Sequence, residues 1–244
     1  MNIVAIGGGE RTPHMIKALD LTGEEKPRAL IIPSAASTQS SFDKKVGIYS
    51  QAFEELGVTA DVLHQYGEMP SKDEIDEKIG NADLLYTFGG NSPYMIRTLA
   101  EQGSDKAIFD AVRKGKVHAG LSAGALLPFR LALSNPVSNP SEVDWEYEYL
   151  EPGVNLIDAV ATAHADQHDP RLGETREDSR MDAFVRTFPH ATAKGFAISN
   201  NASAIFGDNA EVFTTKPEAF VNVVERDNNG TVAVRPANTN DLRL

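Results

Sequence analysis

Short apolar runs alternate with amphipathic segments over the first 121 residues, and this alternation constrains the fold more than any other feature of the chain. The run at 28–33 is continuous in apolar residues after Arg28, as in a strand that is buried on both faces. The segments between the runs carry apolar residues at helical spacing, as Phe42, Val46 and Tyr49 do. The runs lie at residues 3–6, 28–33, 59–63, 83–87 and 117–121. This alternation is typical of βαβ units, so we expect an α/β fold with a doubly wound, mostly parallel sheet.

The last of these runs leads directly into Gly120-Leu121-Ser122-Ala123-Gly124, which has the pattern G-x-S-x-G. Between a strand and a helix, this pattern places a serine on a sharp, strained turn with its Oγ exposed, because the glycines allow close backbone approach. Ser122 is therefore a candidate nucleophile, and the N–H of Ala123 is a candidate oxyanion donor. The alternative is a small-residue turn at which a helix packs on a strand.

Two glycine-rich loops follow other predicted strands. Gly89-Gly90-Asn91 follows the run at 83–87, and ligands of parallel sheets bind beyond the carboxyl ends of the strands. We therefore expect the Gly90 N–H beside Ser122 as a second oxyanion donor, with a plain turn as the alternative. Gly7-Gly8-Gly9 is interpreted as a tight strand-to-helix turn, since a dinucleotide fingerprint needs a third glycine where Thr12 stands.

A later apolar run, residues 156–163, ends directly at a histidine. We predict that His164 is the general base for Ser122. A metal site at His164 and His168 is the alternative, but such spacing suits a helix face, whereas Pro170 and Gly173 indicate a loop. We predict neither a metal nor a cofactor.

The rest of the chain adds one candidate binding residue and a change of strand pattern. Arg176, near the start of a helix predicted from residue 173, is either a surface cation or a clamp for a substrate carboxylate.

The acidic stretch at 134–150 is predicted to be a loop over the cleft mouth, or else a solvated face. Residues 193–199 with 203–214, and 219–225 with 231–234, read as antiparallel hairpins. No long linker interrupts the chain, so we expect one domain over residues 1–244.

Composition excludes several classes of function. The net charge of −12 argues against nucleic acid and anionic membranes as partners. There is no cysteine, which excludes thiolate nucleophiles and thiolate metal sites. No apolar run has membrane-spanning length, and the first residues lack the features of a signal peptide, so we expect a cytoplasmic protein. The oligomeric state stays open, a homodimer included.

Taken together, these residues resemble the peptidase E (aspartyl dipeptidase) and cyanophycinase family of serine peptidases. The resemblance rests on the glycine–asparagine loop at 89–91, the serine motif at 120–125, His164, the run Gly-Glu-Thr-Arg-Glu at 173–177, and residues 195–198. It implies a class I glutamine amidotransferase-like, flavodoxin-like fold with Ser122 as nucleophile and His164 as base. It also implies that the N–H groups of Gly90 and Ala123 form the oxyanion hole. Asn91 and Arg176 are the candidate substrate-binding residues, and a small peptide with an N-terminal aspartate is the implied substrate.

The chain departs from the family at the position of the usual acid. Where the family has a run like Leu-Ser-Asp, this chain has Leu133-Ser134-Asn135, and a second family acid appears as Asn200. Asparagine orients an imidazole through its carbonyl in some triads, so Asn135 is the predicted third member. An acid from 142–148, or Asp166, is the alternative. A catalytically silent or weakened binding protein on the same fold is the alternative function, and an esterase on an α/β-hydrolase fold fits less well.

Overall fold

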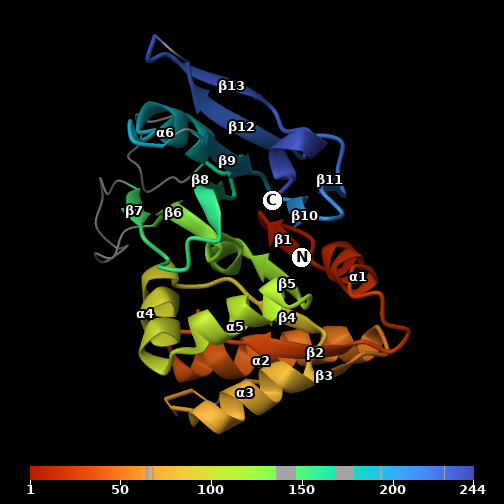
Figure 1. Ribbon diagram of the computed structural model, residues 1–244. Coiled ribbons are helices and arrows are strands. Elements are labelled where there is room, and N and C mark those ends of the chain that lie inside the picture. Colours follow the sequence, from red (N-terminus) through yellow and green to blue (C-terminus); the bar gives the residue numbers. More distant parts are fainter. Residues whose placement is uncertain (64–65, 68, 136–146, 169–178, 193, 228) are drawn as a thin grey trace.

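The computed structural model describes residues 1–63, 66–67, 69–135, 147–168, 179–192, 194–227 and 229–244, and its strands form two sheets (Figure 1). The first sheet has seven strands in the order β11-β10-β1-β5-β4-β2-β3. Its parallel strands are β1 (Asn2–Ile6), β2 (Arg28–Ile32), β3 (Thr59–Val62), β4 (Leu84–Thr87) and β5 (Val117–Leu121). Strands β10 (Ala202–Gly207) and β11 (Glu211–Thr214) extend the sheet antiparallel, beyond β1.

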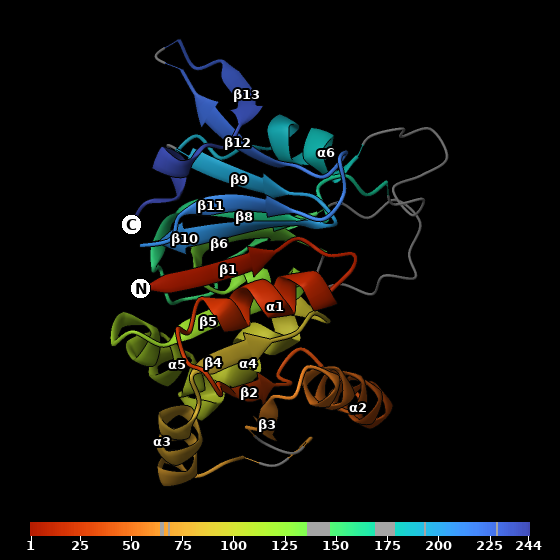
Figure 2. The same ribbon diagram turned by 90° about the vertical axis from the view of Figure 1, so that its right-hand side faces the viewer.

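Helices cover both faces of this sheet, which explains why its central strands β1, β5, β4 and β2 are mostly apolar and buried. Helices α1 (Thr12–Asp20) and α2 (Gln39–Glu55) pack on one face, where Val4 and Ile6 are buried. Helices α3 (Lys72–Asn81), α4 (Ser92–Gln102) and α5 (Ser104–Arg113) pack on the other, where Ile3 and Ala5 are buried. Figure 2 shows α1 on the near side of β1. Successive residues of β1 therefore enter two different cores.

The second sheet has six strands in the order β13-β12-β9-β8-β6-β7. They are β6 (Phe129–Ser134), β7 (Glu148–Leu150), β8 (Ile157–Ala163), β9 (Lys194–Ile198), β12 (Val221–Arg226) and β13 (Val232–Pro236). A short 3-10 helix, η1 (Ser122–Leu126), links the sheets between β5 and β6, and α6 (Arg180–Arg186) and η3 (Thr239–Leu242) complete the described elements.

Aromatic packing joins the two sheets. Phe206 of the first sheet lies edge-on to Phe129 and Phe196 of the second, with ring centroids 5.5 and 5.0 Å apart. All three rings are almost completely buried. Burying a phenylalanine stabilises a fold by about 1.5–3 kcal/mol, so this cluster is a substantial link between the sheets.

The predicted α/β fold is confirmed, and one of the two predicted hairpins is wrong. Residues 194–198 and 202–207 do not pair: β9 lies between β8 and β12 in the second sheet, whereas β10 pairs with β1 and β11 in the first. Asn200 and Asn201 are thus a crossing between sheets. The pairing of 219–225 with 231–234 is confirmed as β12 with β13. In the described part of the chain, no helix is long and apolar enough to cross a membrane.

Candidate active site

The register of the strands brings several loops to the same level. Ile6 of β1 lies opposite Leu121 of β5, and Thr87 of β4 lies opposite Gly120. The loops after β1, β4 and β5 therefore begin side by side. In the second sheet Ala163 of β8 lies opposite Ile198 of β9, which places the residues after these two strands next to each other.

Ser122 follows β5 in a backbone conformation that side chains rarely adopt. Its φ is 56°, in the left-handed region, and it is the first residue of η1. A non-glycine residue in this region is strained, and a strained serine between a strand and a helix is the feature that the G-x-S-x-G pattern predicts. The glycines are required by close packing: a Cβ on Gly120 would overlap the carbonyl of Gly124, and a Cβ on Gly124 would overlap the carbonyl of Thr87.

His164 follows β8 and meets Ser122. Its Nε2 lies 2.8 Å from the Ser122 Oγ. Its φ is 53°, and its backbone N–H donates to the carbonyl of Gly7 at 3.1 Å, which ties the end of the second sheet to the first glycine loop. The two residues that the sequence selects as nucleophile and base are therefore brought together, 42 positions apart in the chain.

Asn200 and Asp166 determine which nitrogen of His164 faces the serine as an acceptor. The Asn200 Oδ1 lies 2.7 Å from the His164 Nδ1, and the Asn200 Nδ2 lies 3.1 and 3.3 Å from the two carboxylate oxygens of Asp166. An ionised carboxylate only accepts, so the amide nitrogen of Asn200 must face Asp166 and its oxygen must face His164. The Nδ1 of His164 then donates, and its Nε2 is left to accept the proton of Ser122.

Asn135 is not in this chain of contacts, so the prediction that it orients His164 is corrected. Its Oδ1 accepts a hydrogen bond from the Arg180 Nη2 at 2.7 Å, and Arg180 also donates to the carbonyl of Ala163 at 3.2 Å. Asn135 follows β6, whereas Asn200 follows β9, the strand whose end lies beside that of β8. Asn200, with Asp166 behind it, occupies the place expected for Asn135.

The surroundings of His164 favour its neutral form. Burial lowers the pKa of His164 below its ordinary value, and the charge of Arg180 acts in the same direction. The hydrogen bond to Asn200 and the carboxylate of Asp166 oppose this effect. A neutral imidazole at physiological pH can accept a proton, as a general base must.

The loop after β4 lies directly against the serine. A Cβ on Gly89 would stand 2.6 Å from the Ser122 Cβ, so only a glycine allows this approach. The Lys45 Nζ of α2 donates to the Gly89 carbonyl at 2.6 Å and lies 5.6 Å from the centroid of the Phe88 ring. In a trans peptide the C=O and the following N–H point in opposite directions. The contact from Lys45 thus directs the Gly90 N–H away from α2.

The loop after β1 also belongs to the site, which the sequence did not reveal. Gly8 has a φ of 151°, and a Cβ there would overlap the ring of His164 and the amide oxygen of Asn200. The Asn201 N–H donates to the Gly8 carbonyl at 2.9 Å. The run of three glycines predicts a tight strand-to-helix turn here, but nothing in the local pattern indicates that this turn contacts a histidine about 155 residues later.

Of the two predicted substrate-binding residues, Asn91 is described and lies at the start of α4. The Asn91 Oδ1 accepts from the Tyr94 N–H at 2.9 Å and caps α4, and the Asn91 N–H donates to the carbonyl of Ala35 at 3.0 Å. These bonds fix the loop that carries Gly90. Arg176 lies outside the described residues, as does most of the acidic stretch at 134–150. Among the residues that are described, no group of three histidine, aspartate or glutamate side chains could hold a metal ion.

One known family matches most of the chain. The model of peptidase family S51 matches residues 3–214, which include every residue of the site. The chain belongs to peptidase family S51. The resemblance inferred from the glycine loop, the serine motif and His164 is therefore confirmed.

Individual relatives are more distant. The chain is 27% identical to peptidase E of an Escherichia coli strain over 75% of its own length and 76% of that protein. It is 33% identical to an uncharacterized peptidase of Listeria monocytogenes over 39% of its length, and this match spans 45% of that relative. Matches to uncharacterized peptidases of Listeria innocua and Bacillus subtilis span 62% and 56% of those chains. The chain thus spans about half the length of these three relatives.

Two solved structures share the fold. A peptidase from an acI-B1 actinobacterium superposes with a TM-score of 0.69, covering 97% of this chain and 94% of that one. A protein from Listeria monocytogenes described as a putative peptidase E superposes with a TM-score of 0.57, covering 97% and 98%. Both are 17% identical to this chain, so they establish its fold.

Proposed function

We propose that this chain is a serine peptidase that hydrolyses short peptides, with dipeptides that begin with aspartate as its preferred substrates. One observation carries the proposal: the Ser122 Oγ lies 2.8 Å from an imidazole nitrogen whose partner nitrogen is held by Asn200. Membership of peptidase family S51 supports the same reaction.

In the proposed reaction, the Ser122 Oγ attacks the carbonyl carbon of the scissile peptide bond while His164 takes the hydroxyl proton at Nε2. The tetrahedral intermediate collapses when His164 gives this proton to the leaving amine, which departs and leaves an acyl-serine ester. Water, deprotonated by His164, then hydrolyses the ester, and the returned proton restores Ser122. The products are two shorter fragments with a new carboxylate and a new amine.

The oxyanion of the intermediate is proposed to accept hydrogen bonds from the N–H groups of Gly90 and Ala123. The first N–H groups of a helix have no acceptor within it, so the Ala123 N–H at the start of η1 is available. Lys45 acts as a positioning residue, because its bond to the Gly89 carbonyl orients the peptide that carries the Gly90 N–H. One such donor contributes about 10²–10³ in kcat in other serine peptidases.

Preference for an acidic N-terminal residue is proposed from the resemblance to peptidase E. Arg176 is the candidate partner of the substrate carboxylate, since a guanidinium binds a carboxylate through two parallel hydrogen bonds. Asn91 contributes by holding in place the loop that carries Gly90, because its side chain already caps α4.

The test is hydrolysis of aspartyl dipeptides, for example Asp-Leu beside Leu-Leu. We expect cleavage of Asp-Leu by the wild type, and loss of cleavage in Ser122→Ala and His164→Ala. Ser50→Ala on α2 is the control for serine replacement away from the site and should retain full activity. Equal rates for Ser122→Ala and wild type would contradict the proposed nucleophile, and faster cleavage of Leu-Leu would contradict the proposed specificity.

A further inference from the structure

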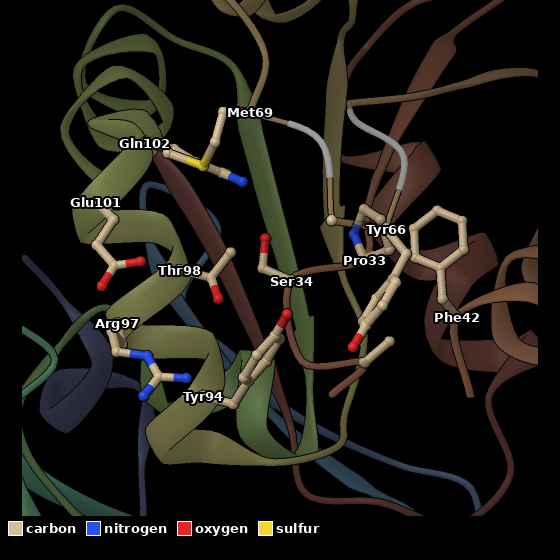
Figure 3. Close-up of a pocket in the computed structure, with 12 residues that line it drawn as sticks. Pro33, Ser34, Phe42, Tyr66, Met69, Tyr94, Arg97, Thr98, Glu101 and Gln102 are labelled. Atoms are coloured by element: carbon tan, nitrogen blue, oxygen red, sulfur yellow. The ribbon is translucent and has the colours of Figure 1, made fainter. Parts of the chain in front are cut away.

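A pocket lies at the carboxyl end of β2, and neither Ser122 nor His164 lines it. Its volume is about 230 Å³, and it is bordered by the loop after β2, by α2, by Tyr66, Gly67 and Met69, and by α4 (Figure 3). Neighbouring strands β2 and β4 lead into helices on opposite faces of the sheet, α2 on one and α4 on the other. This reversal opens a crevice at the carboxyl ends of parallel strands, which is where α/β proteins bind small ligands.

The floor of the pocket holds a polar group without a partner. Ser34 is 1% exposed, and its Oγ has no hydrogen-bond partner among the described residues. In Figure 3 the Ser34 hydroxyl projects into the space between α4 and Tyr66. A buried hydroxyl without a hydrogen bond destabilises the fold, so a ligand that bonds to the Ser34 hydroxyl would gain from satisfying it.

The wall formed by α4 carries one charge of each sign. Arg97 and Glu101 both line the pocket and are four residues apart, so their side chains emerge from the same face of the helix. In the described part of the chain, neither is engaged in an ion pair. The Arg97 guanidinium lies 5.5 Å from the centroid of the Tyr94 ring, which supports it at the pocket edge.

The opposite wall is largely apolar. Pro33, Phe42 and Tyr66 line it, and Figure 3 shows the two aromatic side chains on the side away from Arg97 and Glu101. The Tyr66 hydroxyl is already used, because it donates to the Ser37 carbonyl at 3.2 Å. A ligand that fills the pocket therefore needs a cation and an anion at one end and an apolar group at the other.

We propose that this pocket binds a free α-amino acid with an apolar side chain. Its carboxylate would pair with Arg97 and accept from the Ser34 hydroxyl, and its ammonium group would pair with Glu101. Its side chain would lie against Phe42 and Tyr66. This site is distinct from the catalytic pair and does not depend on the proposed peptidase reaction.

The experiment is calorimetric titration of the full chain with L-leucine, beside isovalerate, which lacks the ammonium group, and isoamylamine, which lacks the carboxylate. We expect binding of L-leucine and at least tenfold weaker binding of either analogue. Arg97→Gln and Glu101→Gln should each weaken L-leucine binding about tenfold, and Ser34→Ala should weaken it severalfold. Arg113→Gln, an exposed arginine on α5, is the matched control and should leave binding unchanged.

Two further measurements separate this site from the catalytic one. L-leucine should bind Ser122→Ala as well as it binds the wild type, and it should still bind after Ser122 has been modified covalently. Absence of L-leucine binding, binding that Arg97→Gln leaves intact, or binding lost on modification of Ser122 would each overturn the proposal. Because Arg97 and Glu101 are exposed, their replacement should leave the fold intact, which circular dichroism can verify.

Discussion

Replacement of Asp166 tests how the site controls its histidine. Asp166 accepts three hydrogen bonds from Asn200, one from its backbone N–H at 2.7 Å and two from its amide nitrogen at 3.1 and 3.3 Å. Asp166→Ala would remove the group that keeps the Asn200 amide nitrogen away from His164. In the flipped amide an N–H would face Nδ1, and His164 would then carry its proton on Nε2, where it cannot accept one from Ser122.

The expected loss has two parts. If both amide orientations become equally populated, about half of the molecules keep the productive tautomer, which lowers kcat/KM about twofold. The larger part is the lost charge: a carboxylate separated from the imidazole by the Asn200 amide, at an effective dielectric constant between about 20 and 40, stabilises the imidazolium by about 1–2 kcal/mol. That is about tenfold in rate, so we expect kcat/KM to fall about 20-fold overall.

The assay is kcat/KM for Asp-Leu across pH, in Asp166→Ala and in two companion variants. Asp166→Asn keeps an acceptor for Asn200 but loses the charge, so its kcat/KM should fall about tenfold rather than 20-fold. Asp158→Ala, an exposed carboxylate on β8, should retain full activity. Because the Asp166 carboxylate raises the pKa of His164, the acid limb of the profile should move to lower pH in Asp166→Ala. If Asp166→Ala keeps wild-type kcat/KM and an unshifted acid limb, the assigned control of His164 is refuted.

Four further outcomes follow from the same contacts. Lys45→Met should lower kcat about 10- to 100-fold with little change in KM, and Lys45→Arg should restore part of the activity, since the bond to the Gly89 carbonyl orients the peptide of the proposed oxyanion donor, Gly90. Equal kcat in wild type and Lys45→Met would remove Lys45 from the proposed mechanism. Gly8→Ala should lower kcat/KM about 100-fold because its Cβ displaces His164, whereas Gly47→Ala, on an open face of α2, should have no effect in the same assay. In the wild type the acid limb of kcat/KM should lie below pH 6.5, since burial lowers the pKa of the base, and a limb above pH 7 would contradict this. Burial lowers the pKa of His118 to about 3, so the free energy of unfolding should fall as pH drops below the unfolded pKa of 6.5, where the unfolded chain binds a proton that the folded chain does not. Between pH 7 and 4.5, urea titration should therefore show a smaller fall in this free energy for His118→Phe than for the wild type. An equal fall in both proteins would exclude that effect.

The strands and the strained turn at Ser122 could be predicted because local pattern determines them. The runs that form β1, β2, β4 and β5 are mostly apolar and buried, since α1 and α2 cover one side of the sheet and α3 to α5 the other. The G-x-S-x-G pattern also has a local cause, because Gly120 and Gly124 permit carbonyl contacts that a Cβ would block. Both signals are visible in a few consecutive residues.

The crossing at Asn200-Asn201 could not be predicted in the same way. A turn of two asparagines suits a hairpin, and Asn201 indeed has a φ of 61°. Which strand β10 joins depends on the free edge of β1, about 200 residues earlier in the chain, and on a place between β8 and β12 for β9. The residues of the turn would be the same whether β9 and β10 paired with each other or joined different sheets.

The partner of His164 was missed for a related reason. Asn135 and Asn200 have the same side chain and both follow strands of the second sheet, so sequence alone gives no reason to prefer either. The decision is made by strand order, which places β9 rather than β6 on the side of β8 that faces the glycine loop after β1. The roles of Gly8 and Lys45 likewise depend on contacts between distant segments.

The most direct test of the central claim is covalent labelling with a fluorophosphonate, followed by peptide mapping. The claim is that His164 activates the hydroxyl of Ser122, so the wild type should carry the label at Ser122. Labelling should be lost in Ser122→Ala and slowed at least 100-fold in His164→Ala. Labelling at another serine, or an equal labelling rate without His164, would contradict it.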